Sequence, residues 1–291
     1  MAEKEEKEKA NILIYILGYD NETLHNATAL FGNYKWAKIV ILPATLLFEN
    51  YMYDKWLIDH YDEWKDYDYV GTLSWRAKDK IMLPDMDKLA VFLKNENIYD
   101  VVPFFVIDNM DHINDIDRRQ PLNNIILNRL FQKLGFPDDY LKNNFIQFYC
   151  NYWITRPKIM VEYIRFFHIC KEIIDDDAEI QKHIWKYVEY NSTLDDDNIK
   201  KIFGRPSFSS HPFVYERIPF LYLNRYPILH PGLSYEKGLY PSNMDSHKKN
   251  NDEKFHTSIK LWLGKHLMSC FSINLKKIKI AYDIEEYDID F

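Results

Sequence analysis

The chain has 291 residues, of which 47% are hydrophobic and 28% charged, values typical of a globular protein with a substantial core. The net charge of −7 disfavours a general nucleic-acid binder, because the basic surface of such a protein normally shows in the total charge. Eight glycines disfavour glycine-rich phosphate loops, and three cysteines are too few for a disulfide framework or a zinc knuckle.

No signal peptide and no apolar segment long enough to span a bilayer is recognised in the sequence. We therefore expect a cytoplasmic protein, of a virus or of its host cell, that could also attach peripherally to a membrane. The sequence makes no prediction of the oligomeric state.

Short apolar runs predict the strands of a buried sheet. They span residues 11–17, 38–42, 69–73 and 100–107, and Pro103 in the last run is typical of an edge or irregular strand. Between the second and third runs, residues 44–64 predict one helix, because apolar and aromatic residues recur there three or four positions apart. These residues are Leu46, Asn50, Tyr53, Leu57, Tyr61 and Trp64. A strand, a helix and a strand in succession predict parallel pairing.

The second half of the chain alternates helical patterns with aromatic and polar segments. Ile159, Tyr163, Phe166, Cys170 and Ile173 form the core stripe of a helix that begins at Pro157. The other predicted elements are helices over 84–93 and 121–134, a strand over 144–154, a loop over 203–212 and an apolar segment over 211–222.

Together these elements predict an α/β fold with a mostly parallel, Rossmann-like sheet flanked by helices and a helical or irregular C-terminal part. Residues 1–10 form a charged tail, residues 11–235 the main domain and residues 236–291 an extension. Within the extension we expect a polar loop over 242–254, a helix over 257–270, a strand over 276–282 and an acidic tail.

Ligands of open α/β sheets bind outside the carboxyl ends of the strands. Three predicted strands end at Gly18-Tyr19-Asp20, at Ser74-Trp75-Arg76 and at Asp108-Asn109. We therefore expect these three segments to be neighbours in one cleft.

Several motifs, taken in order, resemble a known family. Phe48-Glu49-Asn50-Tyr51 is followed by the segment Trp64–Arg76 (WKDYDYVGTLSWR), then by Phe148–Arg156 (FYCNYWITR), Val161–Ile164 (VEYI) and His211–Leu223 (HPFVYERIPFLYL). Their order and spacing, over roughly residues 40–225, resemble a GT-A glycosyltransferase, and most closely the bacterial capsular and exopolysaccharide glycosyltransferases of the DUF4422 type.

The resemblance implies transfer of a sugar from a nucleotide-sugar donor, with a UDP-sugar favoured, to a glycan, glycoprotein or glycolipid acceptor. Aromatic faces such as those of Tyr19 and Trp75 suit a nucleobase or a sugar ring. The implied donor-binding residues are Gly18, Tyr19, Glu49, Tyr53, Ser74, Trp75 and Arg76, and the implied acceptor-binding residues are Asn151, Tyr152 and Arg217.

The sequence departs from the family pattern after the third strand. Ser74 and Ala77 stand where the family has a His and a second Arg, and no Asp-x-Asp motif ends this strand to hold Mn²⁺ or Mg²⁺. Arg76, with Lys78 and Lys80 nearby, offers cations that bind phosphate without a metal. We expect donor binding to require no metal cofactor, or else a Mn²⁺ or Mg²⁺ site at Asp108 and Asp111.

A reaction that inverts the anomeric configuration needs a base for the acceptor hydroxyl, and Asp108, His211 and Glu216 are the candidates. The alternatives are structural: Glu216-Arg217 could form an ion pair, and Arg76 could pair with a surface carboxylate. Two other functions stay open, a non-catalytic binding protein of degenerate glycosyltransferase fold and a Mg²⁺-dependent nucleotidyltransferase-like enzyme.

Overall fold

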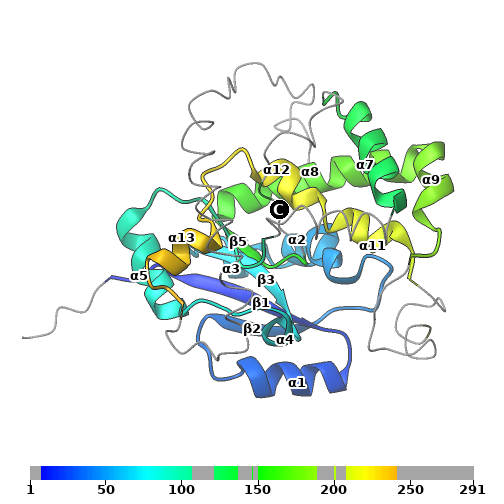
Figure 1. Ribbon diagram of the computed structural model, residues 1–291. Helices are drawn as coiled ribbons and strands as arrows, with labels where there is room; N and C mark the ends of the chain where they lie inside the picture. Colours follow the sequence, from blue (N-terminus) through cyan, green and yellow to red (C-terminus); the bar gives the residue numbers. More distant parts are fainter. Residues whose placement is uncertain are drawn as a thin grey trace, which may run out of the picture.

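A computed structural model describes residues 8–106, 121–136, 146, 150–188, 200 and 208–240. In this part of the chain five strands form one mixed sheet in the order β2-β1-β3-β5-β4 (Figure 1). The strands are β1 (Ile12–Gly18), β2 (Ala37–Ile41), β3 (Tyr69–Ser74), β4 (Val101–Pro103) and β5 (Trp153–Thr155).

The sheet is less uniform than the predicted, mostly parallel one. The central strand β1 pairs in parallel with β2 and β3, whereas β5 pairs antiparallel with both β3 and β4. Four strands therefore run in one direction and β5 runs against them. The expected α/β fold with helices on both sides of the sheet is confirmed, and the sheet is consistent with a Rossmann-like arrangement.

The first crossover is a helix that the sequence pattern did not predict, α1 (Asn21–Phe31). Asp20 caps α1, since its carboxylate accepts a hydrogen bond from the Thr23 N–H at 2.8 Å and the Thr23 hydroxyl accepts one from the Asp20 N–H at 2.9 Å. The predicted strand–helix–strand unit over 38–73 yields parallel strands as expected, but β1 lies between them.

The prediction of one regular helix over 44–64 is wrong. This segment contains a 3-10 turn, a π-helical turn and two short α-helices: η1 (Phe48–Asn50), η2 (Met52–Trp56), α2 (Leu57–Asp59) and α3 (Tyr61–Trp64). Two buried side chains bond to main-chain carbonyl oxygens of the same segment, Asn50 to Leu47 at 3.0 Å and Trp64 to Leu57 at 2.8 Å. Such local bonds compete with regular helical pairing.

The side chains of β1 alternate between two cores, as the period of a strand requires. Leu13, Tyr15 and Leu17 enter the larger core, whereas Ile12, Ile14 and Ile16 enter the smaller one. Helix α1 lies on one side of the sheet, and α8 (Pro157–Asp176) and α12 (Ile218–Leu223) lie on the other (Figure 1).

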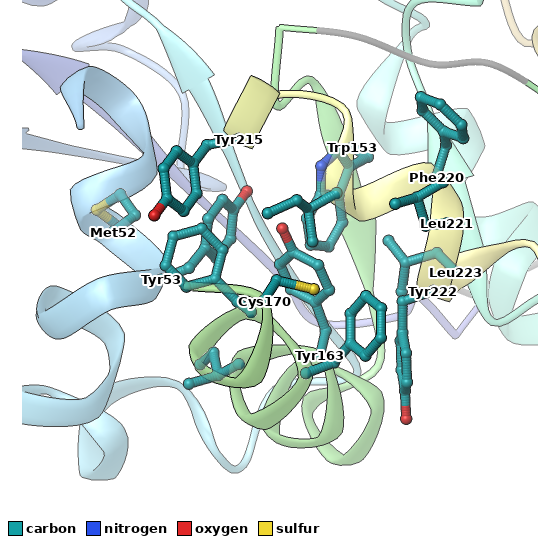
Figure 2. Packing of buried hydrophobic residues seen from close by; sticks show 14 of the residues in the cluster. Met52, Tyr53, Trp153, Tyr163, Cys170, Tyr215, Phe220, Leu221, Tyr222 and Leu223 are labelled. Carbon is teal, nitrogen blue, oxygen red and sulfur yellow. The ribbon is translucent and has the colours of Figure 1, made fainter. Parts of the chain in front are cut away.

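The larger core is mainly aromatic (Figure 2). The Tyr53 ring stacks on Trp153 with ring centroids 5.5 Å apart, and Tyr163 of α8 meets both rings edge-on. The predicted stripe of α8 is thereby confirmed as a core face, with Ile173 partly buried at its edge.

The remaining described helices pack around these two cores. They are α4 (Ala77–Lys80), α5 (Met86–Glu96), α7 (Pro121–Lys133), α9 (Ala178–Ile184), α11 (Ser210–Tyr215) and α13 (Pro231–Glu236).

Several sequence-based boundaries differ from the structure. The predicted loop over 203–212 ends in the first turn of α11, and of the predicted strand 144–154 only Trp153 and Ile154 belong to β5. The boundary expected at residue 235 falls inside α13, and Leu239 beyond it is buried in the smaller core. At the other end, Ala10 is buried and its N–H donates to Ala90 O at 3.0 Å. The elements predicted over 242–291 lie outside the described residues.

Candidate functional site

The carboxyl ends of β1 and β3 meet at one edge of the sheet. Leu17 is the register partner of Ser74, and the Trp75 N–H donates to the Leu17 carbonyl oxygen at 3.0 Å. The predicted neighbourhood of Gly18-Tyr19 and Ser74-Trp75-Arg76 is therefore confirmed. Asp108-Asn109 and Asp111 lie outside the described residues.

The turn after β1 is held by the cap of α1. The Tyr19 N–H donates to the Thr23 hydroxyl at 2.8 Å, and a Cβ added at Gly18 would come within 3.0 Å of the same oxygen. Gly18 thus permits the close turn, and partly buried Tyr19 follows it at the edge of the sheet.

The reversed strand β5 brings a further segment to this edge. The Ser74 and Tyr152 hydroxyls hydrogen-bond to each other, and the Thr72 hydroxyl donates to the Asn151 carbonyl oxygen at 2.7 Å. Cys150 and Asn151 both have left-handed backbones, with φ angles of 63° and 56°. Two successive non-glycine residues in this region are strained, and such strain concentrates at functional sites.

A pair of carboxyl groups lies at the same edge. Glu49 of η1 and Glu216, the C-cap residue that follows α11, interact electrostatically with each other and with Lys80 of α4. The pKa of Glu49 is raised to about 8, chiefly by burial; Lys80 opposes the rise and Glu216 contributes to it. Burial also raises the pKa of Glu216, against the influence of Lys80 and Arg217.

Lys80 connects this pair to the start of β5. Its ammonium lies 5.7 Å from the centroid of the Tyr152 ring, a cation–π distance. Burial raises the pKa of both Cys150 and Tyr152, and Glu49 and Glu216 add to that rise. The Cys150 thiol is therefore protonated at neutral pH, which makes it a poor nucleophile.

The three cationic side chains expected at the donor site make different contacts. The Arg76 Nε lies 3.6 Å from the Asp79 carboxylate, and the guanidinium lies 5.5 Å from the centroid of the Trp75 ring. The alternative that Arg76 forms a surface ion pair is therefore confirmed in part. Lys78 turns towards α1, donating to Leu30 O at 2.7 Å and to the Tyr34 hydroxyl at 3.0 Å. Lys80 is the one of the three that interacts electrostatically with both carboxyl groups.

Several predicted ligand-binding residues are buried. Tyr53 lies in the larger core with its hydroxyl 3.2 Å from that of Thr72, which removes it from the donor-binding set. Four of the predicted residues are buried at the edge itself: Ser74, Asn151, Tyr152 and Arg217. They can hold other residues of the site in position, whereas direct contact with a ligand needs exposed atoms.

The His211 ring is not exposed at this edge of the sheet. It is buried, stacks on Trp185 with centroids 4.5 Å apart, and has its Nδ1 3.1 Å from Leu46 O. Its surroundings are those of a packed side chain, which disfavours it as the base. Arg217 donates to Phe213 O at 2.6 Å, so its guanidinium is fixed beside Glu216.

The residues that a ligand can reach at this edge are only partly buried or exposed: Tyr19, Glu49, Trp75, Arg76, Lys80, Cys150 and Glu216. The sequence pattern places Asn50 in a helical stripe and does not single out Cys150. Asn50 is the polar residue in an otherwise apolar stripe, and this was the sequence signal that it has a special role. Nothing in the sequence distinguished Cys150 from the other cysteines.

Within the described ranges, no group of three or more His, Cys, Asp or Glu side chains is arranged to hold a metal ion. No helix among those residues has the length and apolar character that crossing a membrane requires. No protein-family model, curated protein or solved structure matches the chain.

Proposed function

We propose that the protein is a glycosyltransferase that moves a sugar from a nucleotide-sugar donor, with a UDP-sugar favoured, to a glycan, glycoprotein or glycolipid. The proposal is supported by one observation above all: segments far apart in the sequence, which carry the resemblance, meet at the carboxyl edge of β1 and β3. Asn50 bonds to Asn151, Ser74 bonds to Tyr152, and Glu49 interacts electrostatically with Glu216.

In this proposal the donor lies against the turns that follow β1 and β3. The faces of Tyr19 and Trp75 suit the base or the sugar, and Arg76 offers guanidinium N–H groups to the diphosphate. The expectation that no metal is required stays part of the proposal.

Glu216 is the preferred base for the acceptor. It is partly exposed, whereas His211 is buried. Asp108, which lies outside the described residues, stays a candidate. In a single displacement the acceptor oxygen forms a bond to the anomeric carbon as the bond from that carbon to the diphosphate oxygen breaks. The leaving nucleoside diphosphate keeps the bonding electrons, and the hydroxyl proton passes to the Glu216 carboxylate.

Thermal unfolding with UDP, GDP, CMP and their sugar conjugates, each with Mn²⁺ and with EDTA, tests the proposal. A ligand that binds only the native state raises its stability, by about 2.7 kcal/mol at a hundred times its Kd. We expect one nucleotide to raise Tm in EDTA and Arg76→Ala to remove most of that rise.

The matched control is Lys182→Ala, which removes an exposed cation from α9. A rise that needs the metal favours the nucleotidyltransferase alternative or a metal-dependent transferase. No rise with any nucleotide, in a folded sample, would overturn the proposal in favour of a non-catalytic binding protein.

A further inference from the structure

The carbonyl oxygen of Pro212 is shared by the side chain of Asn50 and the backbone of Glu216. It accepts a hydrogen bond from the Glu216 N–H at 3.0 Å, in the last turn of α11. It also accepts one from the Asn50 amide at 3.4 Å. A carbonyl oxygen has two lone pairs, so one atom of α11 can hold both groups. The turn that contains Asn50 is thereby joined to the residue that serves as the base in the proposed function.

The orientation of the Asn50 amide is fixed by its partners. Its nitrogen also donates to Leu47 O at 3.0 Å, and a carbonyl oxygen can only accept. The side-chain oxygen of Asn50 is therefore the acceptor for the Asn151 amide, at 2.9 Å. The Asn151 carbonyl oxygen in turn accepts from the Thr72 hydroxyl of β3 at 2.7 Å. These bonds between buried residues anchor Asn50 to the sheet.

A second contact joins the same two segments. The Nδ1 atom of His211, in the first turn of α11, lies 3.1 Å from Leu46 O, and this bond requires a proton on Nδ1. The buried His211 ring stacks on Trp185, with ring centroids 4.5 Å apart. The Asn50–Pro212 and His211–Leu46 bonds, called here the two ties, thus hold consecutive residues of α11 against residues 46–50.

The turns that hold the donor in the proposed function are fixed by other bonds. The Tyr19 N–H donates to the Thr23 hydroxyl at 2.8 Å, and the Trp75 N–H donates to Leu17 O at 3.0 Å. Loss of a tie should therefore displace Glu216 while the donor-binding turns keep their positions.

We propose that Asn50 and His211 are positioning residues for Glu216, which they hold in place through α11. The inference rests on the proposed function, and it gives His211, a candidate base from sequence, a different role in the same reaction. A reacting group displaced by about 1 Å can cost about a hundredfold in rate, whereas donor binding need not change. Loss of a tie should therefore lower kcat and leave KM for the sugar nucleotide nearly unchanged.

His211→Phe is the sharpest variant, because a phenyl ring can stack on Trp185 but cannot donate to Leu46 O. His60→Phe is the matched control. The His60 Nδ1 lies 2.8 Å from Trp56 O and its ring stacks on Trp56 at 3.9 Å, between α2 and α3, which carry none of the candidate site residues.

The first test measures nucleoside diphosphate release from the sugar nucleotide that gives the largest rise in Tm. We expect His211→Phe to lose at least about tenfold in kcat, with less than about a threefold change in KM. His60→Phe should stay within about twofold of the wild-type protein in both constants. Equal losses of kcat in the two variants, or a change confined to KM in His211→Phe, would overturn the inference.

The second test asks whether the effect passes through Glu216. In a Glu216→Gln background there is no base left to position, so adding His211→Phe should lower kcat by less than about threefold. Two losses that multiply in the double variant would show that His211 acts independently of Glu216, and would overturn the inference.

The third test needs no substrate and measures amide hydrogen exchange by NMR. Asn50→Ala should speed exchange of the Glu216 N–H at least about tenfold relative to that of the Gln181 N–H, which donates to Asp177 O at 2.9 Å in α9. Equal acceleration of both amides would show that Asn50 supports the whole fold and does not hold Glu216. If Asn50→Ala does not fold, the same comparison is made with His211→Phe.

The two failures are distinguishable. If the wild-type protein releases nucleoside diphosphate from no sugar nucleotide, the proposed function fails, and the exchange rates still decide whether the ties hold Glu216. If the wild-type protein is active and His211→Phe equals it, the proposed function stands and the positioning role fails.

Discussion

The amide of Asn151 donates a hydrogen bond to the side-chain oxygen of Asn50 over 2.9 Å, and both side chains are buried. This bond joins the turn that carries Glu49 to the strained segment that begins β5. It links two of the segments on which the resemblance to glycosyltransferases depends. The geometry of the candidate site therefore depends on a polar contact within the protein interior.

Asn50→Ala should lower the free energy of unfolding by about 2 kcal/mol, because it leaves the buried Asn151 amide without that acceptor. Asn151→Ala should cost a similar amount. A double-mutant cycle in urea should give a coupling energy of at least about 0.5 kcal/mol between the two changes. Strict additivity would show that the bond contributes nothing to stability.

Gly71→Ala should disrupt the centre of the sheet. A Cβ at Gly71 would lie 2.0 Å from Trp153 O and 2.8 Å from Ile154 Cα, both in the backbone of β5. Backbone atoms cannot move aside without breaking the β3–β5 pairing, so we expect a loss above about 2 kcal/mol or a failure to fold.

The control is Gly135→Ala, where a Cβ would meet no atom of the described residues within 4 Å but φ is +75°. Its expected cost is about 1 kcal/mol, from backbone strain alone. Urea unfolding of both variants measures the difference. A Gly71→Ala protein as stable as the Gly135→Ala protein would contradict the close approach of β3 and β5.

Asp177 should stabilise two helices at once. Its carboxylate accepts hydrogen bonds from the N–H groups of Glu179 and Ile180 at the start of α9, and it pairs with Arg129 of α7 at 3.0 Å. Burial raises the pKa of Asp177, but the Ile180 N–H, Lys133 and Arg129 outweigh it and leave the pKa below its ordinary value.

Asp177→Ala should therefore cost about 1–3 kcal/mol at pH 7. The contribution is present above the unfolded pKa of 3.8 and is lost as pH falls through the lower native pKa, so the two proteins should converge at acid pH. Asp175→Ala, which removes an exposed pair with Lys171 on α8, is the control and should change stability by less than about 0.5 kcal/mol.

The stability of the wild-type protein should fall with rising pH relative to Glu49→Gln. The native pKa of about 8 lies above the unfolded value of 4.5, so the native state binds the proton more tightly between these values. The contribution of Glu49 is then complete below pH 4.5 and is lost as pH rises through 8, at a slope of at most about 1.4 kcal/mol per pH unit. Urea unfolding of both proteins at several pH values measures the difference, and parallel curves would contradict the raised pKa.

The strands with long apolar runs were predictable from sequence. Residues 11–17, 38–42 and 69–73 correspond to β1, β2 and β3 within one residue or two, and Pro157 begins α8 as expected. Helix α1 was missed because its buried face consists of Thr23, Ala27 and Phe31, and two small side chains leave no apolar stripe to recognise. Its signal was instead the capping pair of Asp20 and Thr23.

Long-range contacts limited the prediction of the site. The meeting of Gly18 with Trp75 follows from parallel pairing, whereas the meeting of Glu49 with Glu216 depends on how α11 packs, which no local pattern specifies. Lys78 and Lys80 looked equivalent in sequence. Two residues apart on a helical turn they point in different directions, so Lys78 bonds to α1 whereas Lys80 interacts electrostatically with the carboxyl pair.

The most direct test of the account is nucleoside diphosphate release from a panel of sugar nucleotides in EDTA, by wild-type protein and by Glu216→Gln. With no acceptor added, water takes the acceptor's place. We predict release from one class of donor by the wild-type protein and a loss of at least about a hundredfold in the variant. No release from any donor, or equal release by both proteins, would contradict a glycosyltransferase that uses Glu216 as its base.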